Sequence, residues 1–237
     1  MKTHYSEVNI KPIERIDKVM RHNIFQYLND TKRGDFLDIG FGWGNQLRVA
    51  KEMGFTKISG LEIDKNVVDI VKKEFDVKWY DGKKFPYKDG SFDVVLMYMV
   101  IEHLKDPSEI IAEMYRVLRY DGEIIIVTQD PSQCNAIFSN FWEDQTHVRP
   151  YPRIAIENLL RIEGFKIKKS YIKVAHVPIV QRIMTMLGFY KVYYGIMWLC
   201  NLLKVGTKEV CVIGKKEMKQ DSALTKRLGK AGGKGAE

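Results

Sequence analysis

The sequence predicts an α/β protein whose core is a mostly parallel sheet with helices on both faces. Between residues 35 and 128, apolar stretches typical of strands alternate with patterns of helical period, and the connections are short. Such alternation is typical of strand-helix-strand units that bury a parallel sheet. The second observation is an apolar run at 37–39 that leads into three alternate glycines and then a helical pattern. A turn of that kind brings backbone N–H groups to the edge of a sheet, where ligands of α/β proteins bind.

The periodicity of apolar residues places the individual elements. An amphipathic helix is expected over 12–28, and the chain after it turns near Gly34. Strands are expected at 35–39, 57–61, 77–80, 92–98, 122–128, 165–174 and 208–215, and further helices at 43–53, 65–75, 106–119 and 152–162.

Length and charge limit the classes of function. A chain of 237 residues buries one full core, so one domain with additions is expected. Seven of the basic residues and three acids lie in 215–237, so half of the net charge of +8 belongs to a tail rich in Gly and Lys. That tail has little apolar surface to bury and is expected to be disordered. The positive charge is therefore a weak indication of nucleic-acid binding, and no specific nucleic acid is expected as a partner.

Cysteine usage and the amino-terminal segment indicate the compartment. Cys134, Cys200 and Cys211 are widely spaced and form no C-x-x-C pair, which favours reduced thiols and argues against a structural metal site. Residues 1–18 are charged and contain no apolar stretch of the kind found in secretory signals. We expect a cytoplasmic protein.

The glycine run is the motif with the strongest functional content. Residues 37–47 read LDIGFGWGNQL, with Gly40, Gly42 and Gly44 spaced one place more tightly than in the G-x-G-x-x-G dinucleotide pattern. This spacing resembles the first motif of class I S-adenosylmethionine-dependent methyltransferases. A tight strand-to-helix turn without a ligand is the alternative interpretation of the glycines alone.

The resemblance to that family continues over 35–128 and implies S-adenosylmethionine as the cofactor. It implies that Asp38 and the glycine turn hold the methionine portion, and that Glu62, at the end of the second expected strand, holds the ribose hydroxyls. In the same way, Ile63 is expected beside the adenine. The remaining cofactor residues implied by the resemblance are Asp81, as acceptor for the adenine amino group, its neighbour Gly82, and Met99 after the fourth strand. An Asp-Gly pair is also an ordinary turn, and Asp64 is expected to cap a helix.

The same resemblance completes the architecture as a Rossmann-like seven-stranded sheet with strand seven antiparallel. We expect an N-terminal helical segment at 1–34, a methyltransferase domain at 35–214 and the basic tail at 215–237. The sixth strand is expected to run parallel to its neighbours, so two insertions, 129–150 and 175–207, are expected to overhang the cofactor.

The insertion at 175–207 contains an unusually apolar stretch at 183–203. Gly188, Lys191, Gly195 and Asn201 interrupt it, so we do not expect a membrane-spanning helix. Two interpretations remain open for 178–205. The stretch forms core helices or a homodimer contact, or it forms an apolar patch, with Trp198 and two tyrosines, that contacts a lipid surface peripherally.

Candidate catalytic residues follow the fourth and fifth strands. An alcohol that accepts a methyl group must lose a proton, and His147, His103 or Asp144 could accept it. Residues 141–151 resemble the corresponding region of methyltransferases from glycan-modifying clusters and, more loosely, of quinone-pathway O-methyltransferases. The latter resemblance implies a divalent ion held by Glu143, Asp144 and His147. Because this chain departs from that branch after His147, we predict no metal.

Missing motifs narrow the methyl acceptor. After the fourth strand the chain reads Met-Tyr-Met-Val at 97–100, without the Pro-Pro-aromatic run of enzymes that methylate adenine or glutamine amino groups. Cys134 lacks the setting of a cysteine nucleophile. A hydroxyl on a small molecule, glycan or lipid-linked compound is therefore the expected acceptor. The alternatives are an RNA methyltransferase and a non-catalytic cofactor-binding subunit. A basic strand face, expected to be solvated or to contact an acidic substrate, is formed by Lys166, Lys168, Lys169 and Lys173.

Overall fold

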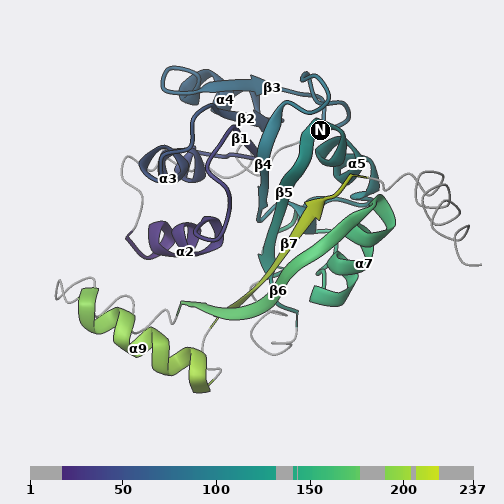
Figure 1. Ribbon diagram of the computed structural model, residues 1–237. Helices are drawn as coiled ribbons and strands as arrows, with labels where there is room; N and C mark the ends of the chain where they lie inside the picture. Colours follow the sequence, from purple (N-terminus) through teal and green to yellow (C-terminus); the bar gives the residue numbers. More distant parts are fainter. Residues whose placement is uncertain (1–17, 132–140, 143, 177–189, 204–206, 219–237) are drawn as a thin grey trace, which may run out of the picture.

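The computed structural model describes residues 18–131, 141–142, 144–176, 190–203 and 207–218 (Figure 1). Its helices are α2 (Lys18–Leu28), α3 (Asn45–Glu52), α4 (Lys65–Val71), α5 (Ser108–Val117), α7 (Arg153–Glu163) and α9 (Tyr190–Leu203), with a 3-10 turn, η1, at Ile101–His103. Its strands are β1 (Phe36–Ile39), β2 (Ile58–Glu62), β3 (Asp76–Trp79), β4 (Phe92–Tyr98), β5 (Leu118–Gln129), β6 (Phe165–His176) and β7 (Thr207–Lys216).

The strands form one seven-stranded sheet in the order β3-β2-β1-β4-β5-β7-β6. The first five strands in that order pair in parallel, and β7 pairs antiparallel with both β5 and β6. This confirms the expected architecture. Within the described ranges β6 pairs with β7 alone, and this pairing is antiparallel, so the expectation that the sixth strand runs parallel to its neighbours is wrong. Two reversals nevertheless give β6 the direction of the parallel strands. Its carboxyl end therefore lies at the same edge of the sheet as those of β1 and β4.

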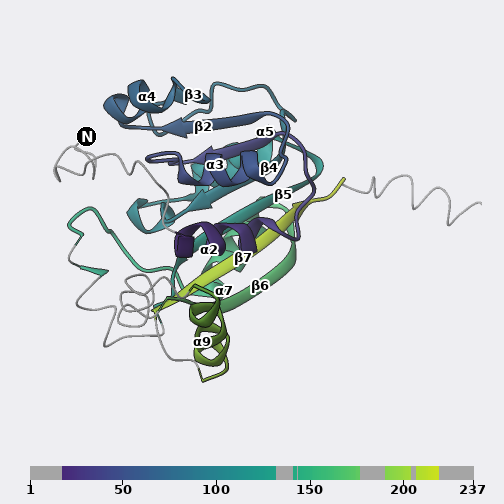
Figure 2. The same cartoon turned by 90° about the vertical axis from the view of Figure 1, so that its left-hand side faces the viewer.

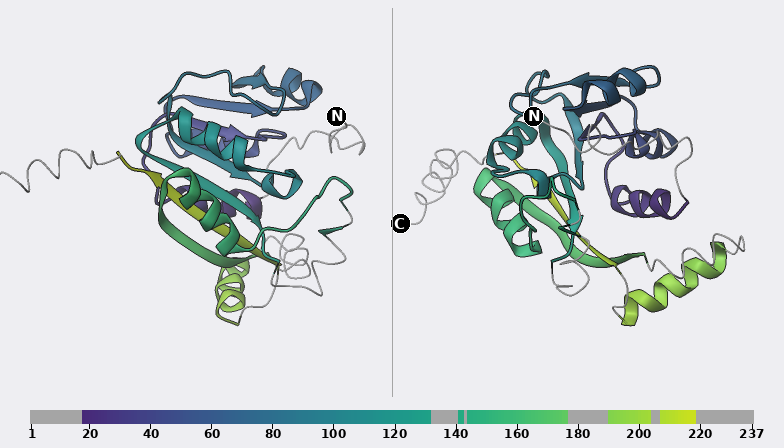
Figure 3. Two further views of the ribbon diagram at one scale, coloured as in Figure 1. Left: turned by 90° about the vertical axis from the view of Figure 1, so that its right-hand side faces the viewer. Right: turned by 180° about the vertical axis from the view of Figure 1, so that it is seen from behind.

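Helices cover both faces of the sheet (Figures 2 and 3). On one face α2, α3 and α4 pack over a core that includes Phe36, Phe41 and Val94. On the other, α5 and α7 pack over a core that includes Leu37, Ile39 and Val95. Neighbouring residues of β1 and β4 thus point to opposite faces, and both faces are buried, as is usual for parallel strands.

Several boundaries differ from the sequence prediction for identifiable reasons. The helix expected at 43–53 begins at Asn45, because Gly44 is its N-cap with a left-handed φ of 78°. Asp64 caps α4 as expected, since its carboxylate accepts hydrogen bonds from the N–H groups of Asn66 and Val67. The strand expected at 122–128 begins at Leu118, directly after α5, because Leu118 pairs with Phe92 across an irregular register. Of the helix expected at 12–28, residues 12–17 lie outside the described part of the chain.

A buried polar cluster fixes α2 on the sheet. The carboxylate of Glu209 on β7 accepts hydrogen bonds from the hydroxyls of Tyr27 and Tyr98, the latter at 3.3 Å. The ammonium of Lys173 lies 3.8 Å from the centre of the Tyr27 ring and donates to Gln26 Oε1 at 2.9 Å. Burial lowers the pKa of Lys173 to about 8, against the opposing pull of Glu209. The cluster links α2 to the carboxyl end of β4, next to the candidate site.

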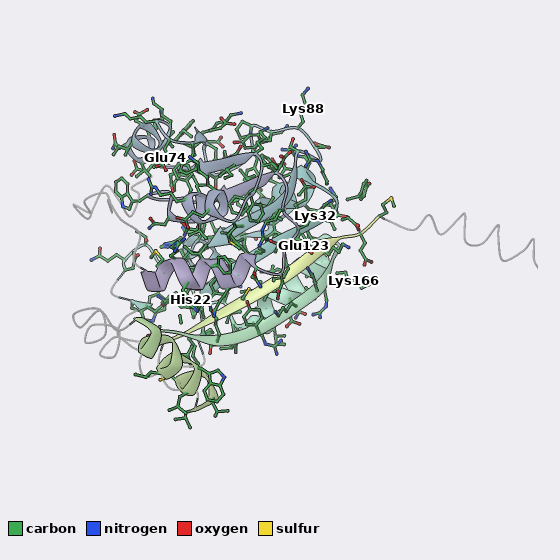
Figure 4. All side chains as sticks on the ribbon, turned by 60° about the vertical axis from the view of Figure 1, so that its left-hand side comes forward. His22, Lys32, Glu74, Lys88, Glu123 and Lys166 are labelled. Atoms are coloured by element: carbon green, nitrogen blue, oxygen red, sulfur yellow. The ribbon has the colours of Figure 1, made fainter. Side chains whose placement is uncertain are left out.

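The lysines expected to form a basic face on β6 are engaged by the protein itself. Lys168 pairs with Glu123 at 2.6 Å, Lys169 with Asp30 at 2.6 Å, and Lys166 with Glu217 at 2.9 Å. Figure 4 shows Glu123 and Lys166 at the far end of the sheet from α9. These ion pairs with the protein's own acids argue against the interpretation that the lysines contact an acidic substrate.

Helix α9 projects from the body of the protein beyond the carboxyl end of β6 (Figure 1). Four of its large apolar side chains are exposed, with exposed fractions of 70% for Trp198, 46% for Leu199, 65% for Leu202 and 61% for Leu203. Nowhere in the described ranges does a helix reach the length and apolarity needed to cross a bilayer.

Candidate active site

The turn between β1 and α3 has the conformation that its glycines predict. Gly40, Gly42 and Gly44 all have positive φ, at 72°, 50° and 78°. A Cβ on Gly40 would lie 2.5 Å from Val100 Cγ2. Any other residue at position 40 would therefore push the turn away from the segment after β4. The amino end of α3 follows at once, and its N-cap, Gly44, provides no side-chain cap for the first N–H groups of the helix, which are available to a ligand.

Asp38, on β1 directly before this turn, is a buried acid without a hydrogen-bond donor among the described residues. Its side chain is fully buried, and neither carboxylate oxygen has a hydrogen-bond partner within the described part of the chain. Burial, with a smaller contribution from Glu62, holds the pKa of Asp38 well above its usual range. A buried carboxylate without a donor is unfavourable unless a ligand supplies one.

Glu62 ends β2 and binds the glycine turn directly. Its Oε2 accepts from the N–H of Gly42 at 3.1 Å, while Oε1 accepts from the N–H groups of Ile63 at 2.7 Å and Asp64 at 3.2 Å. Burial raises the pKa of Glu62, and the three N–H donors oppose that shift. The structure thus brings Glu62 to the glycine turn that follows Asp38, which is the proximity that the sequence prediction requires.

The other predicted cofactor residues follow neighbouring strands. Asp81 and Gly82 come after β3 at the same edge, where Asp81 is exposed and its Oδ1 accepts from the N–H of Lys83 at 3.0 Å. The half-buried Ile63 follows β2. Met99 follows β4 with a φ of 53°, a strained conformation for a residue with a side chain, and its N–H donates to Val127 O at 2.8 Å. Strain of this kind is typical of ligand sites.

This arrangement fits S-adenosylmethionine on the observations above. The unpartnered carboxylate of Asp38 suits a cationic amino group, and Oε2 of Glu62, which accepts one N–H, retains a lone pair for a hydroxyl donor beside the glycine turn. Asp81 is the exposed acid at the next strand, available to an adenine amino group. These assignments remain predictions about a ligand.

A second cluster of functional side chains follows β4 and contains the three predicted catalytic residues, His103, Asp144 and His147. The rings of His103 and His147 lie 4.6 Å apart between centroids. His147 Nδ1 lies 2.6 Å from the carbonyl oxygen of Phe141, and its Nε2 lies 3.7 Å from Asp144 Oδ2. All three predicted catalytic residues thus meet at the carboxyl end of β4, although sequence separates His103 from the others by about 40 positions. Glu143 lies outside the described residues.

Glu102 is a member of this cluster that the sequence prediction missed. It is 1% exposed, its Oε2 accepts from the hydroxyl of Thr128 at 3.0 Å, and burial raises its pKa to about 7. Its carbonyl oxygen accepts from the N–H of Val148 at 2.9 Å, which fixes the segment carrying His147 against η1. The available signal was an acid next to a histidine directly after a buried strand.

Comparison with known proteins agrees with this geometry. A model of the methyltransferase domain family matches residues 37–126. Demethylmenaquinone methyltransferase of Lactobacillus johnsonii is 29% identical over 165 residues, which cover 64% of this chain and 66% of that protein. Ajmaline N-methyltransferase of Rauvolfia serpentina is 34% identical over 128 residues, or 49% of this chain and 43% of that one. The chain spans about half to two-thirds of the length of the first curated relatives it matches.

Solved structures share the fold. A SAM-dependent methyltransferase from Archaeoglobus fulgidus superimposes with a TM-score of 0.61 at 22% identity, and the match covers 84% of this chain and 94% of the other. Residues 37–126, which the family model matches, contain the glycine turn, Asp38, Glu62 and the carboxyl end of β4. Residues 37–126 thus match the methyltransferase domain family, and the chain has the fold of a SAM-dependent methyltransferase.

Proposed function

We propose that this protein transfers a methyl group from S-adenosylmethionine to a hydroxyl group of an apolar small molecule or lipid-linked compound. The cofactor supplies an electrophilic methyl group on a sulfonium. The observation that carries the proposal is the meeting of His103, His147 and Asp144 at the carboxyl end of β4, the edge at which β1 and β2 present Asp38 and Glu62. A methyl acceptor bound there lies between a methyl donor and a proton acceptor.

The hydrogen bonds of His147 suit a proton acceptor. The carbonyl oxygen of Phe141 can only accept, so Nδ1 of His147 donates to it and the lone pair of the neutral ring is on Nε2. Nε2 would accept the proton of the acceptor hydroxyl, while the cofactor would supply the methyl group, its carbon–sulfur bond breaking so that the sulfur leaves as a neutral thioether. Asp144 Oδ2, at 3.7 Å, then stabilises the imidazolium.

The names of relatives support an apolar acceptor without fixing the atom methylated. The Lactobacillus johnsonii relative is named for demethylmenaquinone, a quinone, and the Rauvolfia serpentina relative for an amine of ajmaline. A phenolic hydroxyl that loses its proton activates either its own oxygen or the ring carbons beside it. A base at His147 serves both outcomes, so carbon methylation of a hydroquinone is the second candidate reaction.

The role of His147 is tested by a rate measurement. His147→Ala is expected to lower the turnover number about 100-fold, because a positioned base contributes at least that much, and to leave S-adenosylmethionine affinity unchanged. The assay follows label from S-adenosylmethionine into organic-soluble product with a membrane extract as acceptor source. His22→Ala, on α2 and engaged with Gln26, is the matched control and is expected to be as active as the wild type (Figure 4). An unchanged rate in His147→Ala would contradict the assignment.

The exposed face of α9 supports a peripheral lipid contact for such an acceptor. Trp198 and Leu202 lie one turn apart, as do Leu199 and Leu203, so the four form one apolar stripe. From 177 to 208 the sequence contains four basic residues and no acid, which complements an anionic surface. Since α9 follows β6 beyond its carboxyl end, a membrane bound there lies on the acceptor side of the sheet.

Vesicle binding tests this contact. The full chain is expected to co-float with vesicles containing phosphatidylglycerol, and the double variant Leu202→Gln/Leu203→Gln to lose most of that binding, because about 2 kcal/mol of burial is removed per leucine. Ile162→Gln on α7, where the side chain is 83% exposed, is the control for loss of a surface apolar residue. Loss of a dimer in light scattering, with vesicle binding unchanged, would assign the stripe to a second copy of the chain instead.

A further inference from the structure

Three side chains near the carboxyl end of β4 have the composition of a metal site. One carboxylate oxygen of Glu102 and one ring nitrogen each of His103 and His147 all lie within 4.8 Å of one another. Glu102 is buried, while the two histidines are half-buried. This set differs from the acids at 143 and 144 that the resemblance to quinone-pathway enzymes pointed to, and it shares only His147 with them.

The hydrogen bonds around His103 determine which of its nitrogens carries the lone pair. The hydroxyl of Thr146 has a single proton and donates it to Asp144 Oδ1 at 2.6 Å. The same hydroxyl oxygen lies 2.9 Å from His103 Nδ1, so it must accept a proton from that nitrogen. Nδ1 of His103 is therefore protonated, and the lone pair of the neutral ring lies on Nε2.

His147 has the same tautomer for an independent reason, since its Nδ1 donates to the carbonyl oxygen of Phe141. Both imidazoles thus present Nε2 lone pairs, each fixed by a hydrogen bond on the opposite side of the ring. Metal-binding histidines are oriented in this way, by a carbonyl or carboxylate behind the ring. Glu102 is held similarly, because the hydroxyl of Thr128 donates to one of its oxygens.

We propose that Glu102, His103 and His147 bind one divalent transition-metal ion of the Zn²⁺ or Co²⁺ type. Two imidazoles and one carboxylate favour these ions over Mg²⁺, which prefers oxygen ligands. Three protein ligands leave a further coordination position open, as in zinc sites that bind a substrate. The inference goes beyond the proposed methyl transfer: His147 is a proton acceptor in the metal-free protein and a ligand in the metal-loaded protein.

Titration with Co²⁺ tests the site directly, because the absorption of bound Co²⁺ reports its ligands. The full chain, stripped with chelator and dialysed, is expected to bind one Co²⁺ that Zn²⁺ displaces. His147→Ala and Glu102→Gln are each expected to weaken Co²⁺ binding by about 100-fold or more. Thr146→Val, which removes only the hydroxyl behind His103, is expected to weaken it about 10-fold.

Control measurements separate this proposal from the proposed function. His22→Ala is expected to bind Co²⁺ like the wild type, and every variant to keep its affinity for S-adenosylmethionine. Co²⁺ affinity that is unchanged in His147→Ala, or absence of Co²⁺ binding at millimolar concentration, would overturn the metal site. Either result, obtained with a stripped protein that still binds S-adenosylmethionine and labels product, leaves the methyltransferase proposal standing.

Discussion

Replacing Glu62 with alanine is expected to weaken the binding of S-adenosylmethionine about 1,000-fold. A hydrogen bond from a hydroxyl to this charged acceptor contributes roughly 1.5–3 kcal/mol, and a backbone donor left without an acceptor costs roughly 1–3 kcal/mol, so the loss amounts to about 4 kcal/mol. The substitution also removes the acceptor for the N–H groups of Gly42, Ile63 and Asp64, which shape the turn. Isothermal titration with S-adenosylmethionine and with S-adenosylhomocysteine measures the effect, and both ligands are expected to lose affinity equally because they share the ribose.

Two further variants make this result specific. Asp69→Ala removes an exposed acid on the neighbouring helix α4, where Asp69 pairs only with Lys72, and is expected to leave affinity unchanged. Glu62→Gln keeps the size of the side chain, but its amide faces the N–H of Gly42 with a donor, so it too is expected to bind weakly. If Glu62→Ala stays folded by circular dichroism and binds S-adenosylmethionine as tightly as the wild type, the ribose assignment is wrong.

The relation between Glu62 and the glycine turn was predictable from sequence for a physical reason. Both follow parallel strands at the point where those strands end, and parallel strands end at the same edge of a sheet. The spacing of apolar residues gives the strands, and the glycines give the positive φ values of the turn. Contact between the Glu62 carboxylate and the Gly42 N–H then follows from pairing of β1 with β2 in register.

The proposed metal site was not predictable in the same way. Glu102, His103 and His147 meet only because the segment after residue 144 folds back onto η1, through the Val148 N–H and the Glu102 carbonyl. The spacing of apolar residues does not predict that contact, because neither segment is a long helix or strand. Sequence indicated both histidines as proton acceptors and, by resemblance, His147 as a metal ligand together with Glu143 and Asp144, but it left Glu102 without a role.

Helix α9 illustrates a different limit of prediction from sequence. Its apolar composition correctly indicated a helix, but composition does not distinguish a helix that packs in the core from one that is exposed. The exposed fractions of Trp198 and Leu202 separate these cases, because a core helix would bury both. The short α4 shows the complementary effect: the periodic pattern extends to residue 75, whereas the helix ends at Val71.

Asp38→Asn is expected to weaken S-adenosylmethionine binding about 1,000-fold while making the ligand-free protein more stable. Removing one charge of a buried ion pair costs roughly 2–5 kcal/mol of binding free energy, and the proposed pair here joins Asp38 and the cofactor's amino group. Without ligand, Asp38 has no hydrogen-bond partner in the described part of the chain, so its charge is uncompensated. The neutral amide has nearly the same shape and is expected to raise the free energy of unfolding by about 2 kcal/mol at pH 8.

The raised pKa of Asp38 predicts how the stability difference between Asp38→Asn and the wild type changes with pH. Burial raises the folded-state pKa of Asp38 well above the unfolded value of 3.8. A group of this kind binds more protons in the folded than in the unfolded protein. Its favourable contribution to the free energy of unfolding is therefore fully present below pH 3.8 and is lost as pH rises through the folded pKa. The stability advantage of Asp38→Asn over the wild type is therefore expected to grow from acid to neutral pH in urea titrations. An advantage that does not change with pH would contradict an ionised, unpartnered Asp38.

Adding cofactor is expected to reverse the order of stability. At a concentration of 100 times the wild-type dissociation constant, ligand binding stabilises the wild type by about 2.7 kcal/mol, whereas a variant with 1,000-fold weaker affinity gains less than about 0.1 kcal/mol. Wild type then exceeds Asp38→Asn, although it is the less stable protein without ligand. Thermal unfolding of both proteins with and without S-adenosylmethionine measures this crossing. The order of stability reverses only if the Asp38 carboxylate both destabilises the ligand-free protein and binds the ligand. If Asp38→Asn loses affinity for S-adenosylmethionine but is as stable as the wild type without ligand, a donor within the protein already compensates Asp38.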